Sequence, residues 1–367
     1  MPPKKHTPGF QVWLEVDGRH LLGSQEAQIL AGIKKLGSFM ATAKALGISY
    51  AHAWNVIDNV RSILGEPIVE AKKGGEYGGG AKLTEAGLKI LGEYYDLERR
   101  IGQSVSNTSD NKPRAELFEL KTELPEFTII GSDCVGINIL VQLMLAEKKF
   151  SYEVVSVGSS GGLTAIMLGE ADVAGIHLLD EETGEYNVPF LKRYWIADKA
   201  VLVKGYQRDT GLILAKDNPK HIRGIEDLLR PDVRFVNRSL GSGTRTLLDH
   251  FLKRIGDKKG LKFRDIVGMI KGYPVEARSH GEVADAVLNR KADVALGIKG
   301  AAKMRGLDYI SIAQESFDFV IEEKRLNKPL VEFFIEKLSS EGFANNLRQQ
   351  DIGLTNSKDT GTIIYRP

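Results

Sequence analysis

The stretch Leu36–Asn59, LGSFMATAKALGISYAHAWNVIDN, decides how the N-terminal part of the chain folds. Ser38 can cap a helix because its hydroxyl accepts a hydrogen bond from an early helix N–H, and Gly47 suits the left-handed turn that ends one. Ser49 can cap a second helix, whose apolar positions recur at helical spacing. Two short helices joined by a tight glycine turn are typical of a helix-turn-helix, which presents its second helix to DNA, although an ordinary helical hairpin has the same pattern.

A hairpin predicted directly after the second helix strengthens the DNA-binding interpretation. Residues 68–71 and 81–83 can form two short strands around the glycine-rich turn 72–80. Such a wing can lie along DNA phosphates, where Lys72 and Lys73 would supply salt-dependent affinity. A flexible surface hairpin is the alternative for these residues taken alone. The exposed N-terminal part of the recognition helix would supply the other contacts, for which the candidates are Ser49, Tyr50, His52 and Asn55.

A long helix is predicted from Thr84 to about Gln103, with an apolar stripe formed by Leu88, Leu91, Tyr95 and Leu97. So small a domain is not expected to cover this stripe, and two-fold DNA sites call for two-fold proteins. We therefore predict a homodimer through the helix after Thr84, with packing onto its own domain as the alternative. Residues 104–125 are polar and contain two prolines, which predicts a linker after a DNA-binding domain at 1–103.

The N-terminal part, about residues 10–103, resembles the DNA-binding domain of the molybdate-responsive, ModE-type regulators. The stretches that carry the resemblance are GSFMATAKALGISYAHAWNVID, at 37–58, and EYGGGAKLTEAG, at 76–87. The resemblance implies a winged helix-turn-helix homodimer that binds palindromic operator DNA. The chain departs from that family after residue 125, since nothing there resembles two small β-barrel oxyanion domains.

Composition limits the remaining possibilities. The 367 residues allow two or three domains, and a net charge of only +2 requires any nucleic-acid surface to be a local patch. The start of the chain shows no signal peptide, and no segment approaches the roughly 18 apolar residues of a membrane span. One cysteine and seven scattered histidines give no metal-binding pattern. We expect a cytoplasmic protein without a membrane segment, a metal or a resident cofactor.

From residue 126 onward, short apolar runs alternate with helical segments, which predicts parallel sheets covered by helices on both faces. The pattern at 165–174, Ala-Ile followed by Ala-Asp-Val-Ala, returns at 286–295 as Ala-Val followed by Ala-Asp-Val-Ala. Two similar α/β units indicate two related lobes within 126–367. Ligands of such folds bind in the cleft between the lobes, where helix N-termini and strand ends converge.

Four loops are expected to line this cleft: residues 131–133, 158–162, 237–245 and 279–281. Three of them are small-residue turns rich in hydroxyl groups, each at the start of an expected helix. Exposed N–H groups, hydroxyls and the helix dipole make such turns natural anion sites, although helix capping alone explains each loop by itself. Several such loops in one two-lobed unit favour a small anionic ligand.

The second half, roughly residues 126–350, resembles the periplasmic-binding-protein-like (type 2) domains of cytoplasmic regulators. The matching stretches are SVGSSGGLTAIMLGEADVAGIHLLDEETGEYNVPF, NRSLGSGTRTLLD, SHGEVADAVLNRKADVALGI and GLDYISIAQESFDFVI. The resemblance implies an oxyanion ligand, with molybdate or tungstate favoured, held mainly by neutral donors. The candidate ligand residues are Ser132, Asp133, Ser159, Ser160, Gly161, Arg238, Ser242, Gly243, Thr244, Arg245, Tyr273 and His280, and His177 is expected as a further hydrogen-bonding group of the cleft.

Two other functions compete with a ligand-responsive transcription regulator. The Gly158–Gly162 turn matches the G-x-S-x-G pattern of serine hydrolases, with Ser160 as nucleophile and Asp265 and His280 as its partners. Small-residue turns match that pattern easily, so we expect no enzyme. The second alternative is a protein that binds an oxyanion and delivers it to molybdopterin assembly without binding DNA.

Overall fold

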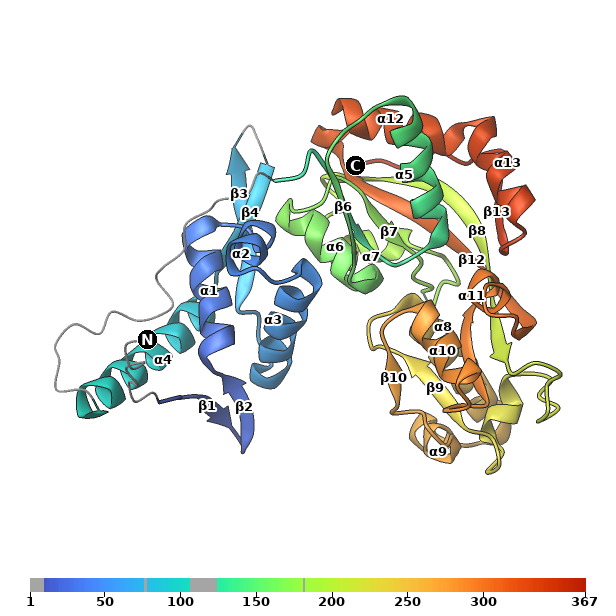
Figure 1. The fold of residues 1–367 in the computed structure, drawn as a ribbon, viewed down its shortest axis with the longest axis horizontal. Helices are drawn as coiled ribbons and strands as arrows, with labels where there is room; N and C mark the ends of the chain where they lie inside the picture. The colour runs from blue at the N-terminus through green and yellow to red at the C-terminus, as the bar shows by residue number, and fades with distance from the viewer. Residues whose placement is uncertain (1–9, 76–77, 106–123, 181) are drawn as a thin grey trace, which may run out of the picture. The chain divides into compact units, whose positions relative to one another are not determined.

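The computed structural model describes residues 10–75, 78–105, 124–180 and 182–367. They form two compact units, one from residues 1–124 with 168–170 and the other from 125–167 with 171–367. The boundary lies at the end of the predicted linker 104–125, of which residues 106–123 lie outside the described residues. Each unit is built from its own set of helices and strands (Figure 1).

The first unit contains three short helices between two hairpins, followed by a long helix. Its elements are β1 (Leu14–Val16), β2 (Arg19–Leu22), α1 (Ser24–Leu36), α2 (Phe39–Leu46), α3 (Tyr50–Leu64), β3 (Val69–Gly75), β4 (Gly78–Leu83) and α4 (Glu85–Val105). Strands β3 and β4 pair antiparallel, as do β1 and β2. The predicted helices, the hairpin after them and the long helix are all present in the predicted order.

Side-chain caps explain why α2 and α3 start where they do. The Ser38 hydroxyl accepts a hydrogen bond from the backbone N–H of Ala41, and the Ser49 hydroxyl accepts one from His52. Gly47 ends α2 in the left-handed region at φ 66°. Only three residues, 47–49, separate the two helices, so the predicted turn between them is tight.

The second unit is organised around two long antiparallel strands, β8 (Ala200–Leu214) and β12 (Asp308–Glu322). They lie in one sheet with the order β10-β9-β11-β8-β12-β7, and β13 and β14 also pair with β8. One apolar core surrounds the first half of β8 and the second half of β12, and separate cores surround their other halves. The two strands therefore pass through both lobes and connect them.

Lobe A, at the start of β8, holds the residues before β8 and the end of the chain. Its elements are β5 (Phe127–Gly131), α5 (Val135–Glu147), β6 (Tyr152–Ser156), α6 (Gly158–Leu168), β7 (Ala174–Ile176), α7 (Val188–Arg193), η3 (Glu323–Arg325), α12 (Pro329–Ser339), α13 (Glu341–Gln350), β13 (Leu354–Asn356) and β14 (Ile363–Tyr365). Lobe B comprises η2 (Ile225–Leu229), β9 (Phe235–Arg238), α8 (Gly243–Lys259), α9 (Phe263–Met269), β10 (Glu276–Ala277), α10 (His280–Leu288), β11 (Val294–Ile298) and α11 (Lys299–Lys303).

The internal repeat seen in the sequence has a structural counterpart in the two lobes. In lobe A, Asp172 accepts a hydrogen bond from the backbone N–H of Thr128, beside β5, at 3.0 Å. In lobe B, Asp293 accepts one from the backbone N–H of Arg234, beside β9, at 2.8 Å. The aspartate of the repeated pattern thus accepts a backbone hydrogen bond near the start of a parallel strand in each lobe. Parallel pairing of β5 with β6, and of β9 with β10 and β11, agrees with the predicted α/β lobes.

Close packing of β8 on β12 gives a testable prediction. A Cβ atom added at Gly205 would lie 2.0 Å from the backbone oxygen of Phe317, whereas one at Gly224 would meet nothing within 4 Å. We expect Gly205→Ala to lower the free energy of unfolding by about 2 kcal/mol or more, because the strands must separate. The control Gly224→Ala should melt like the wild type in a thermal scan followed by circular dichroism. Equal melting temperatures for the two variants would contradict the close strand packing.

Candidate ligand site between the lobes

A buried ion pair occupies the middle of the two strands that connect the lobes. Arg208 of β8 lies directly opposite Glu315 of β12, and neither side chain is exposed. The Arg208 Nε and Nη2 atoms donate to Glu315 Oε2 at 3.1 and 2.8 Å, and the Thr210 hydroxyl donates to the same oxygen. Burial alone would raise the pKa of Glu315, but the charge of Arg208 lowers it below its usual range.

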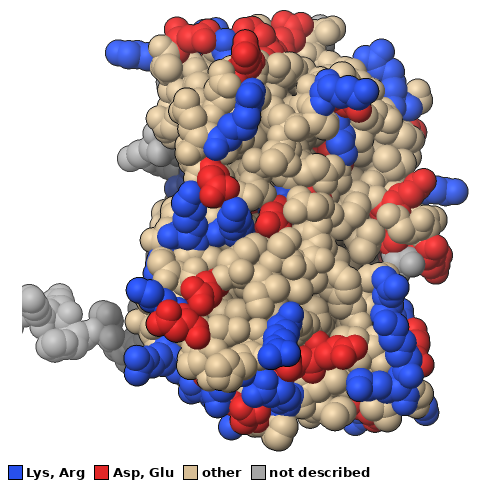
Figure 2. Space-filling model, turned by 90° about the vertical axis from the view of Figure 1, so that its right-hand side faces the viewer, with Lys and Arg blue, Asp and Glu red and all other residues tan. Residues whose placement is uncertain are grey.

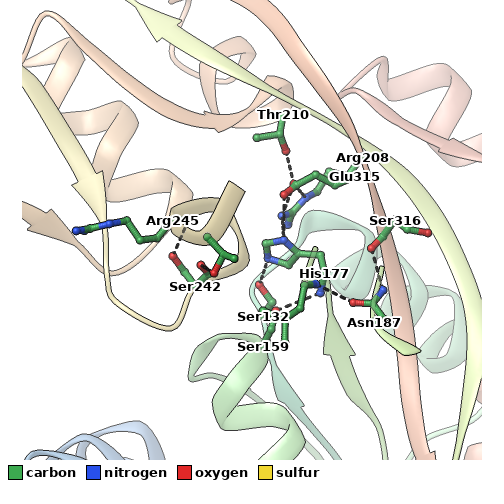
Figure 3. Close-up of polar contacts among 12 residues, drawn as sticks. Ser132, Ser159, His177, Asn187, Arg208, Thr210, Ser242, Arg245, Glu315 and Ser316 are labelled. Atoms are coloured by element: carbon green, nitrogen blue, oxygen red, sulfur yellow. Dashed lines mark hydrogen bonds and ion pairs between the residues drawn. The ribbon is translucent and has the colours of Figure 1, made fainter. Parts of the chain in front are cut away.

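His177 connects this ion pair to lobe A. It follows β7, and its Nδ1 atom lies 2.8 Å from Arg208 Nη2 (Figure 3). Its Nε2 atom lies 2.8 Å from the Ser132 hydroxyl, and its backbone N–H donates to the Ser159 hydroxyl at 3.1 Å. Burial and the positive charge of Arg208 lower the pKa of His177 to about 4. The imidazole is therefore neutral at physiological pH.

The backbone around His177 is fixed by a second buried side chain, Asn187. Its amide oxygen accepts a hydrogen bond from the Leu178 N–H at 2.7 Å. Its amide nitrogen donates to the Ser316 carbonyl at 3.1 Å and to the Asp318 carboxylate at 2.7 Å. Because Asn187 joins the segment after β7 to β12, it holds His177 in register with Glu315.

Lobe B contributes Arg238 at the end of β9, Thr244 in the first turn of α8 and His280 in the first turn of α10. All three are buried. Burial and the nearby charge of Arg208 lower the pKa of Arg238 to about 10. Burial, reinforced by the charges of Arg238 and Arg208, lowers the pKa of His280 well below 6.5. Because the charges of Arg208 and Arg238 shift each other's neighbours in this way, these groups of the two lobes form one electrostatic cluster.

The cluster contains buried polar atoms without a hydrogen-bond partner among the described residues. They are Arg208 Nη1, Arg238 Nε and Nη1, Thr244 Oγ1 and both ring nitrogens of His280. Unpaired buried donors cost free energy and are uncommon in folded proteins. Two guanidinium groups and a hydroxyl therefore have unused hydrogen-bond donors in this cluster, and such groups bind anions. We identify this cluster, the interlobe site, as the candidate ligand site.

The lobes approach each other closely beside this site. A Cβ atom at Gly243, the first residue of α8, would lie 2.2 Å from the His177 carbonyl oxygen and 2.4 Å from its ring. A Cβ atom at Gly158 of α6 would lie 3.4 Å from the Gly241 oxygen. Gly243 is thus needed for the N-terminus of α8 to reach His177.

The structure distributes the other predicted ligand residues unevenly. Ser132 is buried in the interlobe site, and Asp133 beside it is half-buried. The Ser159 hydroxyl already accepts from the His177 N–H, and Gly161 is buried within α6. Ser160 is half-buried and faces Gly241 across the lobes. The Ser242 hydroxyl donates to the Ser239 carbonyl and accepts from the Arg245 N–H, so it caps α8 rather than presenting a free donor.

Arg245 and Tyr273 do not join the site, which corrects the prediction that they line the cleft. The Arg245 guanidinium lies over the Tyr273 ring at 4.2 Å and pairs with Asp249 and Glu276 at 3.3 Å each. The Tyr273 hydroxyl donates to Asp249 at 2.8 Å. Figure 3 shows Arg245 directed away from His177 and Glu315. Gly243 faces His177, and Arg245 lies two residues further along α8, about 200° around the helix axis, so its side chain points to the other side.

The serine-hydrolase alternative lacks an assembled triad. Neither ring nitrogen of His280 has a hydrogen-bond partner among the described residues, so His280 contacts neither Ser160 nor Asp265 in this way. Both Arg208 and Glu315, by contrast, were not predicted from the sequence. Other polar residues flank both of them in the sequence, Gln207 and Asp209 on β8 and Gln314 and Ser316 on β12, so no sequence pattern marked them as buried.

The candidate DNA contacts in the first unit differ in exposure. Tyr50 is buried, with its ring 6.1 Å from that of Phe39, so its prediction as a DNA contact is corrected to a core role. Asn55, His52 and Ser49 are exposed on α3 and its cap, and His52 Nε2 lies 2.9 Å from the Gln25 amide. The side chains of Lys72 and Lys73 lie outside the described residues.

Surface charge places the cationic character of the ligand site in context. Figure 2 shows lysine and arginine side chains interspersed with aspartate and glutamate on one face of the molecule. Within the described residues, no three histidine, cysteine, aspartate or glutamate side chains are grouped to hold a metal ion. No helix of the described part is both long and apolar enough to cross a membrane. Arg208 and Arg238 therefore differ from the surface cations in being buried, and they are not part of a broad basic surface.

Comparison with known proteins gives a family match for the second unit. The model of a family described as PBP superfamily domain matches residues 141–339. The chain is 35% identical over 207 residues to the uncharacterized protein YvgK of Bacillus subtilis, which covers 56% of this chain and 63% of that protein. It is 35% identical over 147 residues to the transcriptional regulator ModE of Yersinia pestis, which covers 37% of this chain and 56% of that protein. The chain thus spans less than two thirds of either relative.

Among solved structures, that of Peb3 from Campylobacter jejuni is similar with a TM-score of 0.45 and 16% sequence identity. The match covers 63% of this chain and 100% of that one.

The two buried neutral histidines predict a loss of stability in acid. His177 has a pKa of about 4 in the folded protein, and His280 is lowered as well, whereas both return to about 6.5 on unfolding. Between those values the unfolded chain binds more protons, so the free energy of unfolding falls as the pH drops from about 6.5 towards 4. Each histidine contributes up to about 1.4 kcal/mol per pH unit.

Melting temperatures measured between pH 8 and pH 4.5 test this prediction. The double variant His177→Leu, His280→Leu should lose less stability than the wild type over that range. The control His52→Gln, which changes an exposed histidine, should follow the wild-type curve. An identical pH dependence in the double variant and the wild type would contradict the proposed origin of the acid sensitivity.

Proposed function

The chain belongs to the PBP superfamily domain family, and we propose that it is a transcription regulator whose second unit senses a small oxyanion, with molybdate or tungstate favoured. In this proposal the first unit is a winged helix-turn-helix that binds double-stranded operator DNA as a homodimer. Ligand binding to the second unit changes the affinity of the first for DNA. The protein is cytoplasmic and has no enzymatic activity.

The observation that carries the ligand assignment is the set of unpaired donors in the interlobe site. Arg208 and Arg238 are buried cations with open N–H groups, and within the described part of the chain Glu315 is the carboxylate paired with Arg208. An anion bound between the lobes would satisfy these donors and contribute the negative charge that Arg238 lacks. The similarity to ModE of Yersinia pestis, a transcriptional regulator, supports a regulatory role.

The DNA-binding assignment is supported by the arrangement of α2, α3 and the β3–β4 hairpin. A capped helix follows α2 after a three-residue turn, and its exposed positions include His52 and Asn55. A two-stranded hairpin follows directly, in the place of a wing. On α4, Leu88 is 45% exposed and a surface hollow is lined by Leu14, Leu97 and neighbouring charged residues. The exposed Leu88 supports dimerisation through α4, whereas Leu91 of the predicted stripe is buried and the hollow is lined mainly by charged side chains.

Regulation requires the oxyanion to favour one arrangement of the two lobes over the other. Since β8 and β12 connect the lobes and carry Arg208 and Glu315, a ligand bound to Arg208 acts at the connection itself. A differential binding free energy of about 1–3 kcal/mol between two arrangements is typical of such coupling. This would change operator affinity about 5- to 150-fold.

Thermal stabilisation by sodium molybdate tests the ligand assignment. A ligand that binds only the folded state raises the melting temperature, and the shift grows with the logarithm of the ligand concentration once this exceeds the Kd. We expect stabilisation of the wild type, and its loss in Arg238→Ala, which removes the open guanidinium of lobe B. The control Arg348→Ala removes an exposed cation on α13 and should keep the full shift. Stabilisation of Arg238→Ala equal to that of the wild type would contradict the proposed site.

DNA affinity measured by fluorescence anisotropy on a fragment of the protein's own promoter tests the regulatory assignment. Asn55→Ala should weaken binding about 5- to 150-fold, because a good side-chain contact to a base is worth about 1–3 kcal/mol. Ser62→Ala, an exposed change nearer the end of α3, serves as the control and should bind like the wild type. Molybdate should change the affinity of the wild type but not that of Arg238→Ala. If the wild-type protein bound no DNA in this assay, oxyanion delivery would be favoured instead.

A further inference from the structure

The N-terminus of α2, the first helix of the proposed helix-turn-helix, is capped by a residue from far along the chain. Glu170 Oε1 accepts a hydrogen bond from the Phe39 N–H at 2.8 Å, and Oε2 accepts one from the Met40 N–H at 3.3 Å. The Ser38 hydroxyl donates to Oε2 at 3.0 Å. Although 130 to 132 positions separate these residues in the sequence, Glu170 belongs to the same compact unit as α2.

Glu170 completes a cap that Ser38 leaves unfinished. The first N–H groups of a helix have no partner within the helix. Ser38 supplies an acceptor for the Ala41 N–H, while the N–H groups of Phe39 and Met40 donate to Glu170. Glu170 is buried, and a buried carboxylate needs compensation, which three donors and the positive end of the helix dipole provide here. The carboxylate therefore binds the start of α2 as an external anion would.

The donors that Glu170 occupies are of the kind that hold the DNA backbone in a helix-turn-helix complex. In this motif the first helix crosses the backbone while the second enters the major groove. N–H groups at helix N-termini and serine hydroxyls are common donors to phosphate oxygens. A phosphate and the Glu170 carboxylate are both anionic acceptors, so they cannot occupy the same donors at the same time.

The chain on both sides of Glu170 leads to the interlobe site. Helix α6 precedes it and carries Ser159 in its first turn, where the Ser159 hydroxyl accepts from the His177 N–H at 3.1 Å. Strand β7 follows it and ends one residue before His177. Residues 168–170 belong to the first unit, whereas residues 167 and 171 belong to the second. A shift of α6 or β7 is therefore transmitted to the Glu170 contact through the chain itself.

We propose that Glu170 makes an autoinhibitory contact, in which its carboxylate competes with an operator phosphate for the N-terminus of α2, and that oxyanion binding changes how often this contact forms. This inference rests on the proposed function, because it names the residue through which the ligand acts on DNA binding. While the contact is formed, it places a negative charge where DNA would place a phosphate and lowers operator affinity. Withdrawal of Glu170 frees the donors of Ser38, Phe39 and Met40 for the DNA.

Fluorescence anisotropy with the full-length protein, on a fragment of its own promoter and over a series of KCl concentrations, tests the competition. Without molybdate, Glu170→Ala should bind about tenfold more tightly than the wild type, since hydrogen bonds to charged groups have effects of this size. One additional phosphate contact should also steepen the slope of log Kobs against log salt concentration by about 0.9. Glu170→Gln, which keeps an acceptor for α2 but loses the charge, should show a smaller gain.

A matched control separates this effect from a general change in charge. Glu341→Ala removes an exposed carboxylate in the first turn of α13, and it should keep the wild-type affinity and salt dependence. Sodium molybdate should change the operator affinity of Glu170→Ala by a smaller factor than that of the wild type. Melting temperatures show whether Glu170→Ala folds, and Glu170→Gln provides the same comparison with the cap retained.

The outcomes separate this inference from the proposed function. If the wild type binds the operator and both Glu170 variants bind it equally well or more weakly, with an unchanged salt slope, then Glu170 only caps α2. That result overturns the inference and leaves the proposed function in place. A molybdate response of wild-type size in the Glu170 variants overturns the link between this contact and the ligand. A wild-type protein that binds no DNA overturns the inference and the proposed function together.

Discussion

The ion pair between Arg208 and Glu315 is the constraint on which the second unit depends. Both side chains are fully buried at the point where β8 and β12 pass from one lobe to the other. A buried ion pair is seldom more stabilising than apolar residues of the same size, because desolvation offsets the attraction. Removal of either partner alone, however, typically costs about 3–5 kcal/mol. The pair is therefore better explained by its effect on the interlobe site than by a contribution to stability.

The ion pair determines which hydrogen-bond donors remain unused in the interlobe site. Glu315 neutralises one charge and fixes the Arg208 plane through Oε2, so Arg208 Nη1 stays open. Burial lowers the pKa of Arg238 and of both histidines, and the charge of the same guanidinium lowers each of them further. With both histidines neutral, the charges of the interlobe site are those of Arg208, Glu315, Arg238 and the half-buried Asp133, whose negative charge counteracts the lowering of the Arg238 pKa.

Local sequence patterns predicted the elements better than they predicted the site. The caps at Ser38 and Ser49 and the turn at Gly47 depend only on neighbouring residues, and all three occupy the predicted positions. The orientation of Tyr50 depends on tertiary packing against Phe39, which helical spacing alone did not distinguish from exposure. The α/β lobes followed from the alternation of short apolar runs with helices, and the repeated Ala-Asp-Val-Ala pattern marked the equivalent strand in each lobe.

The interlobe site combines residues of two kinds. Those at strand ends and helix starts could be predicted from the sequence, and those in the middle of strands could not. Ser132, Thr244 and His280 follow strands or start helices, and such positions meet at the cleft in any fold of this class. Arg208 and Glu315 lie in the middle of long strands, and their pairing is set by a register between residues 107 positions apart. Arg245 failed as a prediction because it lies two residues beyond Gly243 on α8, which turns it from the face towards His177 to the face towards Asp249.

Closure of the lobes can be located from the same contacts. Gly243 brings the N-terminus of α8 against His177, while the pairing of β8 with β12 shifts register between Ser311 and Ala313 and again between Phe317 and Phe319. These irregularities lie on either side of Glu315, where the two strands can change direction without breaking either lobe's core. In the proposed function, a ligand bound to Arg208 and Arg238 would therefore act beside these irregularities, at the strands that join the two lobes.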